Sequence, residues 1–144
     1  MTNLTLDISK WVKKAGANTD KVIKKIIIDL GTGLVETTPV GDAKYWKNPA
    51  PKGYVGGRAR ANWQYGFSAM PTGELNIVDP GGQTTINKIR SSITQVAGVH
   101  WIANNVDYIE ALENGWSRQA PNGMLRVTVM RFQQIVKGAA SGVN

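Results

Sequence analysis

Few side chains in this sequence are suited to acid–base or nucleophilic chemistry. There is one histidine, His100, and no cysteine, so thiol nucleophiles, thiolate metal sites and disulfides are excluded. A structural zinc site normally needs several Cys or His ligands, and a Ser, Thr or Lys nucleophile needs an activating group beside it. His100 falls in a predicted strand on the face opposite Trp101. This position favours a surface or interface histidine over a catalytic one.

The carboxylates and glycines do not form a convincing site either. Asp107, Glu110 and Glu113 recur at every third position, so they share one side of a helix and could bind a cation. A solvated helix face is the simpler interpretation. The run 31–33 lacks the third glycine of a dinucleotide-binding loop, and 53–57 lacks the Lys-Ser/Thr of a phosphate-binding loop. We therefore expect no enzyme activity, no cofactor and no metal.

The positive charge of the chain is concentrated in its first part. The formal net charge is +7, and residues 1–60 carry eleven Lys and Arg against five Asp and Glu. Such a concentration of charge can attract an acidic protein surface or a phosphate backbone. A solvated helix face explains it as well, so a small basic nucleic-acid-binding module is kept as an alternative.

Hydrophobic periodicity predicts two helices and then a long loop. A short amphipathic helix is expected over 4–15, with Leu4, Ile8, Trp11 and Val12 on one face. A second helix from Thr19 to about Thr37 is core-facing; Gly31 and Gly33 weaken it and Pro39 ends it. Residues 39–57 are rich in Pro and Gly but also contain Tyr45, Trp46 and Tyr54. Loops of this length are usually functional or disordered, so we interpret this one as an extended contact loop that becomes ordered on docking.

The rest of the chain alternates between strands and helices. The patterns predict strands over about 59–68, 74–78 and 99–104, and helices over 84–96, 107–114 and 124–137, followed by a frayed tail at 138–144. Asp107 is expected to cap the helix over 107–114 and Gly115 to close it. The chain is thus predicted to be a single α+β domain, residues 1–144. A small, mostly antiparallel sheet would pack against helices, with a long N-terminal helix and a C-terminal helix. No membrane span or secretory signal is seen, so synthesis in a host cytoplasm is expected.

Two stretches resemble the tail-completion and neck proteins of tailed bacteriophages. The first comprises Thr37-Thr38-Pro39-Val40-Gly41 and Gly57-Arg58-Ala59-Arg60-Ala61-Asn62-Trp63, which here are separated by an insertion over about 42–56. The second is the more specific. It runs from Trp101-Ile102-Ala103-Asn104-Asn105-Val106-Asp107-Tyr108-Ile109 through Leu112-Glu113-Asn114-Gly115-Trp116 to about residue 129.

This resemblance implies a structural virion protein located in the phage tail or neck. The subunit would form a ring, expected to be sixfold, at the head-proximal end of the tail. Its partners would be identical subunits, the tail terminator or tube protein, and the head-closure or connector protein. DNA would pass through the lumen without specific binding, and no cofactor or activity is implied. The tail terminator of the same particle is an alternative that the sequence separates poorly from tail completion.

The tryptophan content points independently to an interface. Five tryptophans in 144 residues exceed what one small core readily absorbs, and Trp is enriched at binding hot spots. Closed rings use heterologous interfaces, so one subunit should present two different patches. We expect these patches in the 39–57 loop and the 101–121 turn. The candidate interface residues are Tyr45, Trp46, Tyr54, Arg58, Asn105, Tyr108, Trp116 and Arg118.

Overall fold

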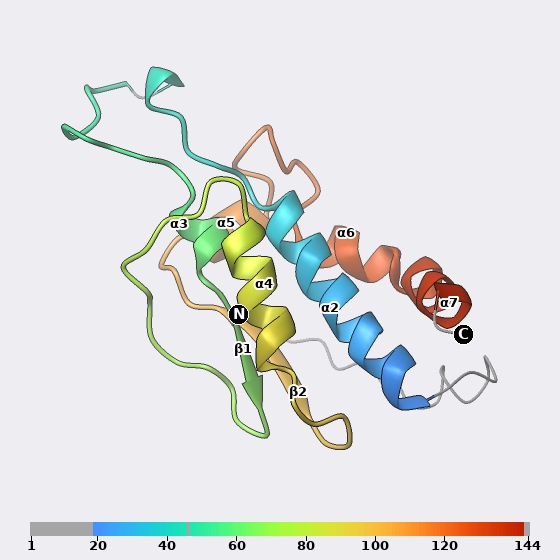
Figure 1. The fold of residues 1–144 in the computed structure, drawn as a ribbon. Helices are drawn as coiled ribbons and strands as arrows, with labels where there is room; N and C mark the ends of the chain where they lie inside the picture. Colours follow the sequence, from blue (N-terminus) through green and yellow to red (C-terminus); the bar gives the residue numbers. More distant parts are fainter. Residues whose placement is uncertain (1–18, 46, 143–144) are drawn as a thin grey trace.

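The computed structural model describes residues 19–45 and 47–142. The helix predicted over 4–15 and the candidate residue Trp46 lie outside these ranges. The described part is α+β, as predicted, with a long first helix, a final helix and a two-stranded antiparallel sheet (Figure 1). In chain order its elements are α2 (Thr19–Thr37), the 3₁₀ turn η1 (Ala43–Tyr45), α3 (Arg58–Ala61), β1 (Trp63–Phe67), α4 (Gln83–Ser92), β2 (His100–Asn104), α5 (Ile109–Glu113), α6 (Leu125–Met130) and α7 (Phe132–Gly142).

Helix α2 is the centre of the domain. Figure 1 shows it between α4 on one side and α6 and α7 on the other, with the sheet behind α4. Its glycines lie where neighbouring helices approach closely. A Cβ on Gly31 would come within 3.2 Å of Ile89 in α4, and one on Gly33 within 3.3 Å of Thr128 in α6. The residues that weaken this helix locally therefore let two other helices pack against it.

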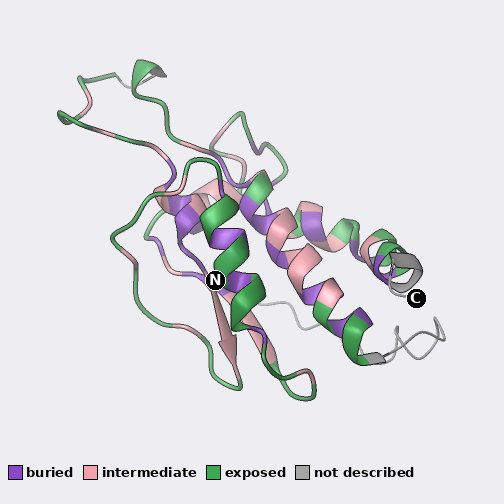
Figure 2. Ribbon diagram, in the orientation of Figure 1, coloured by how far each residue is buried: buried purple, intermediate pink, exposed green. Residues whose placement is uncertain are grey.

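The core is continuous from the sheet to the last helix. Figure 2 shows the buried residues on the sides of the helices that face one another. Burying these apolar side chains is the main force that holds the elements together. The largest buried side chains of α2, α4, β1, α6–α7 and their connections are Ile23, Ile26, Ile27, Leu34, Trp63, Ile86, Ile89, Ile93, Met124 and Phe132.

The first strand starts later than predicted. Residues 58–61 form the single helical turn α3, and only Trp63–Phe67 are extended. Gly57 precedes this turn with φ +108°, and its carbonyl accepts a hydrogen bond from the Ala61 N–H at 2.9 Å. Ala59 and Ala61 are both buried. The prediction was wrong here because the two buried alanines continue the alternation of the strand although their backbone is helical.

The strand predicted over 74–78 does not form. The backbone of Leu75 bonds to a side chain instead of a strand, because its N–H donates to Asn62 Oδ1 at 2.7 Å and its C=O accepts from Asn62 Nδ2 at 3.0 Å. Asn62 is fully buried and so acts as a fixed partner for this segment. An amide side chain thus satisfies the backbone groups that a sheet ladder would otherwise pair.

Strands β1 and β2 pair with Tyr65 opposite Ile102 and Phe67 opposite His100. The Ile102 side chain reaches Gly31 of α2, so this face of the sheet packs on the helices. Trp101 lies opposite Gly66 on the other face, so the prediction that His100 and Trp101 occupy opposite faces is confirmed.

Helices α4 and α5 each differ from the prediction at one end. Helix α4 ends at Ser92, because Ile93 is extended with ψ 95°, so the helix does not reach residue 96. Asp107 does not cap α5: the N-cap position is Tyr108 and has no side-chain cap bond, whereas Gly115 closes the helix with φ +85° as expected.

The helix predicted over 124–137 is two helices, α6 and α7, separated by Arg131 at ψ 1°. The N–H of Arg131 bonds to the Thr128 carbonyl three residues back, which tightens the end of α6. Helix α7 continues through Gly142. Residues 138–142 are therefore helical and were wrongly predicted to be a frayed tail.

Candidate functional site

The first stretch that carries the phage resemblance forms a junction between α2 and β1. The Thr38 side chain is fully buried; its hydroxyl donates to the Leu34 carbonyl at 2.6 Å and accepts from Trp63 Nε1 at 2.8 Å. Arg60 donates from Nη2 to the carbonyls of Glu36 and Thr38, and from Nη1 to that of Pro80. The otherwise unpaired carbonyls at the C-terminus of α2 are thereby satisfied.

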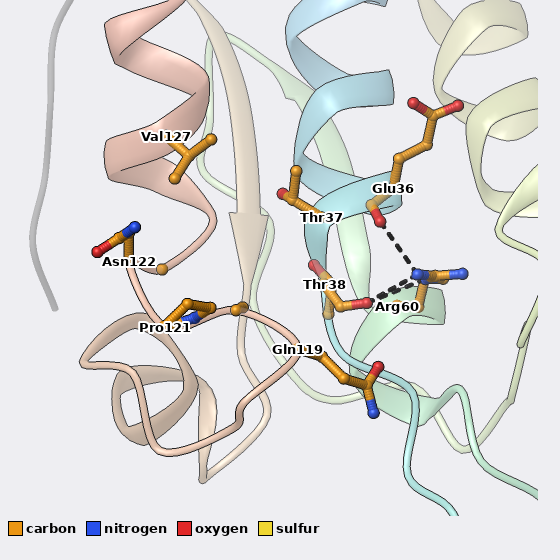
Figure 3. A pocket seen from close by; sticks show the side chains of 10 residues that line it. Glu36, Thr37, Thr38, Arg60, Gln119, Pro121, Asn122 and Val127 are labelled. Atoms are coloured by element: carbon orange, nitrogen blue, oxygen red, sulfur yellow. Dashed lines mark hydrogen bonds between the residues drawn. The ribbon is translucent and has the colours of Figure 1, made fainter.

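A hollow of about 340 Å³ opens beside this junction (Figure 3). Figure 3 shows the Arg60 guanidinium directed at the end of α2, and Pro121 and Val127 on the opposite wall. Because the Arg60 guanidinium is bonded to backbone carbonyls, its role here is structural. The hydroxyls in its walls, those of Thr37 and Thr38, donate to carbonyls of α2, and Glu36 is the one carboxylate in the lining.

The two predicted contact segments are joined at this hollow. Gln119 forms a pair of hydrogen bonds with one residue of the 39–57 loop: the Val40 N–H donates to Oε1 at 3.0 Å, and Nε2 donates to the Val40 carbonyl at 2.9 Å. The amide thus takes the place of a neighbouring strand. The beginning of the 39–57 loop is consequently held against the turn that carries Trp116 and Arg118.

The second stretch of resemblance also has a clear structural role. The Glu113 carboxylate accepts hydrogen bonds from the backbone N–H groups of Met124, Leu125 and Arg126, at 2.8 to 3.0 Å. These groups belong to the first turn of α6, where a negative charge is favourable. Arg126 completes the contact by donating from Nη2 to the Glu113 carbonyl. Glu113 therefore joins α5 to α6 and is not available as a cation ligand.

The backbone of Trp116 is fixed by a hydrogen bond, and its side chain is exposed. It follows Gly115 in a Schellman motif, in which the Gly115 N–H bonds to the Leu112 carbonyl and the Trp116 N–H to the Ala111 carbonyl. The residue at the Trp116 position of this motif commonly packs back onto the helix. Here the facing residue is the small Ala111, and Trp116 is 83% exposed. A large aromatic side chain is therefore presented to solvent on an ordered backbone.

A second exposed surface surrounds Arg58. Its guanidinium is fixed by Glu74, at 2.9 Å from Nε, and by Asn76, at 2.9 Å from Nη1. Nearby, Asn105 donates to the carbonyls of Pro71 and Gly73, just before Glu74. We call this region the Arg58 surface and define it by Tyr54, Arg58, Glu74, Asn76, Asn105 and Tyr108.

Tyr108 belongs to the same surface. Partial burial raises the pKa of its phenol; Arg58 opposes this shift, whereas Tyr54 and Glu74 add to it. These electrostatic effects place the two tyrosines and the ion pair close together. The side chain of Tyr108 is nevertheless 43% exposed, so it remains accessible to a partner.

The candidate residues thus fall into two groups. Tyr54, Arg58, Asn105 and Tyr108 lie together on the Arg58 surface. Trp116 and Arg118 follow the other end of α5, and both are exposed. Tyr45 ends the 3₁₀ turn η1, and its side chain, like Trp46, is outside the described part.

Sequence reasoning missed several exposed apolar residues, three of which follow residues of the Arg58 surface or lie close to them in the sequence. Ile77 and Val78 are 46% and 47% exposed, and Val55 is 54% exposed. The pattern over 74–78 was interpreted as a strand and not as an exposed surface segment. Met130, which is 84% exposed, was assigned to a helix but not to a surface.

His100 is bonded on both sides of its ring. Nδ1 lies 2.7 Å from the Tyr65 hydroxyl and Nε2 lies 2.7 Å from the Val96 carbonyl, so the imidazole links β1, β2 and the segment before β2. The carbonyl can only accept, so Nε2 carries a proton. Within residues 19–45 and 47–142, no three His, Asp or Glu side chains are grouped as metal ligands.

No protein-family model, curated protein or solved structure matches this chain. None of the helices in the described ranges combines the length and the apolar character needed to cross a bilayer.

Proposed function

We propose that this chain is a structural subunit of a tailed bacteriophage. It assembles into a sixfold ring at the head-proximal end of the tail, between the tail terminator or tube protein and the head-closure or connector protein. The resemblance of residues 37–41, 57–63 and 101–129 supports this family. The α+β architecture with a long first helix is what that resemblance implies.

The observation that carries the proposal is the exposed Trp116. Burying a tryptophan removes a large apolar area from water, and Trp is the residue type most typical of interface hot spots. The hydrogen-bonded backbone lowers the entropy lost on binding, because only the side-chain rotamer of Trp116 remains to be fixed. Neighbouring Arg118 is also exposed and can pair with a carboxylate of a second subunit.

A basic nucleic-acid-binding module is the second candidate. Lys21 and Lys24 are exposed on the first turns of α2, whereas Lys25 is paired with Asp29 at 3.1 Å. This candidate accounts for the charge of residues 1–60 but gives no role to Trp116. The tail terminator of the same particle remains a variant of the ring proposal, since it too is a ring subunit of the tail.

The proposal is tested by replacing each of two equally exposed apolar residues with alanine, in separate variants. Trp116→Ala should weaken ring formation on the order of thirtyfold, because loss of an interface hot spot costs about 2 kcal/mol. Met130→Ala is the matched control, since Met130 is 84% exposed and Trp116 83%. Native mass spectrometry over a concentration series gives the association constants. Equal association of both variants, with unchanged thermal stability, would show that Trp116 is not an interface anchor.

A further inference from the structure

The hollow beside the junction of α2 and β1 has room for one large side chain. Its volume is about 340 Å³, and sites that hold small molecules in proteins are about 300–1,000 Å³. Figure 3 shows Pro121 and Val127 on one wall, opposite Thr37 and Thr38 at the end of α2. Asn122 belongs to the same lining, and its amide has no hydrogen bond within the described ranges, so it can accept one. The hollow therefore suits a side chain that is mostly apolar and carries one donor.

Trp116 has these properties and is left exposed in its own subunit. An indole presents a large apolar ring and a single N–H donor. The side chain is 83% exposed, so it does not fill the hollow of its own copy, although residues 119–123 of the same turn line that hollow. Binding hot spots are typically side chains of this kind that fill a pocket of the partner. A second copy of the chain offers such a pocket to each exposed Trp116.

The charges beside these two features are complementary. Arg118, two residues after Trp116, is exposed, and its guanidinium has no partner among the described residues. Of the acids in residues 19–45 and 47–142, those whose carboxylate has no hydrogen bond or ion pair are Asp20, Glu36 and Asp107. Glu36 is the one among them that lines the hollow. A free cation beside the tryptophan and a free anion at the hollow therefore have the signs that two docked copies need.

We propose that Trp116 of one copy docks in the hollow of a neighbouring copy and that Arg118 pairs there with Glu36. This inference rests on the proposed function, because it names the surface that receives the Trp116 turn in the ring. The side chain and the hollow are different surfaces, so the contact is heterologous, as closed rings require. An exposed ion pair adds little affinity by itself. The indole therefore supplies most of the binding, and the ion pair selects the orientation.

Charge reversal tests this contact in the full-length chain. Arg118→Glu sets two carboxylates against each other, and Glu36→Arg sets two guanidinium groups against each other. Each variant alone should therefore associate on the order of tenfold more weakly than the unmodified chain, as measured by native mass spectrometry over a concentration series. Both positions are exposed, so the melting temperatures should be unchanged. The double variant Glu36→Arg/Arg118→Glu should recover the association, because its contacts again join opposite charges.

Two further measurements show whether the pair is specific and whether it joins different copies. Arg118→Glu/Asp107→Arg is the matched control, since Asp107 is also exposed and has no partner in the described part of the chain. This variant should stay as weakly associated as Arg118→Glu alone. A mixture of the single variants Arg118→Glu and Glu36→Arg should associate like the unmodified chain and contain the two chains in equal numbers, because contacts between unlike chains join opposite charges.

Single variants that associate like the unmodified chain would overturn the inference, and so would equal recovery in the Asp107 control. A mixture that stays weakly associated would also overturn it, because the pair would then not join different copies. If the unmodified chain forms rings, any of these results removes the contact and leaves the ring function standing. Recovery in the mixture with assemblies no larger than pairs would support the contact and count against the ring. An unmodified chain that stays monomeric throughout would contradict both proposals.

Discussion

Thr38 is the residue at which the long helix is joined to the sheet. One buried hydroxyl donates to the Leu34 carbonyl and accepts from the Trp63 indole, so it satisfies a helix end and a core aromatic side chain together. Thr37 also bonds to a carbonyl of α2, that of Gly33, but its side chain is only half-buried. The two adjacent threonines therefore differ in what their loss would leave unsatisfied.

We predict that Thr38→Val lowers the free energy of unfolding by about 1–3 kcal/mol, because two buried polar groups lose their partner. Thr37→Val should cost about 1 kcal/mol or less, since water can reach the freed carbonyl. Urea denaturation monitored by circular dichroism measures both values. A loss for Thr37→Val as large as that for Thr38→Val would contradict the assignment of Thr38 as the junction.

The sequence allowed some residues to be placed correctly and others not. The exposure of Trp116 could be predicted, because it follows a helix-closing glycine and belongs to no periodic apolar face. The roles of Glu113 and Gln119 could not be predicted, because their partners are backbone groups up to 79 residues away in sequence. Side-chain bonds to distant backbone leave no periodic pattern in a sequence.

At the scale of elements, the prediction succeeded where the repeating apolar pattern extended over many residues. The apolar stripe of α2 covers several turns, and both ends of that helix were predicted correctly. Short elements were ambiguous: Ala59 and Ala61 fit a strand pattern but form one helical turn after the positive-φ Gly57. Residues 74–78 carry a strand pattern, but Asn62 binds the backbone of Leu75 in place of a neighbouring strand.

Two helical glycines should respond to substitution in opposite directions. Gly138→Ala in α7 meets no atom within 4 Å, so it should raise the free energy of unfolding by about 1 kcal/mol through helix propensity. Gly33→Val places a branched side chain against Thr128 and should lower it by about 1–3 kcal/mol. Thermal and urea denaturation of both variants provide the measurement. A stabilising Gly33→Val would contradict the close packing of α2 on α6.

At the scale of the whole molecule, the fold class followed from the order of elements, but the surface did not. The sequence identified a domain with helices packed on a small antiparallel sheet. It could not show that Tyr54, Arg58, Asn105 and Tyr108 converge, since their proximity depends on the path of three loops. Nor could it show that the 39–57 loop and the 115–121 turn meet through Val40 and Gln119.

The arrangement of the whole subunit is consistent with two contact regions. The Arg58 surface lies before α5, at Tyr108, and the Trp116 turn follows the same helix. A ring needs two different patches on each subunit, and these two regions differ in composition: one surrounds the Arg58–Glu74 ion pair and includes Tyr108, and the other is a single exposed aromatic side chain beside an arginine. His100 belongs to neither contact region: its ring links β1, β2 and the segment before β2.

The most direct test of the ring proposal is the native mass of the purified chain, measured with and without a DNA duplex at low and at moderate salt. We predict a closed assembly of six chains whose mass is unaffected by DNA at moderate salt, because the proposed contacts join protein surfaces and do not involve phosphates. A stoichiometric DNA complex that dissociates steeply as salt rises would contradict the proposal. The chain would then be a basic nucleic-acid-binding module.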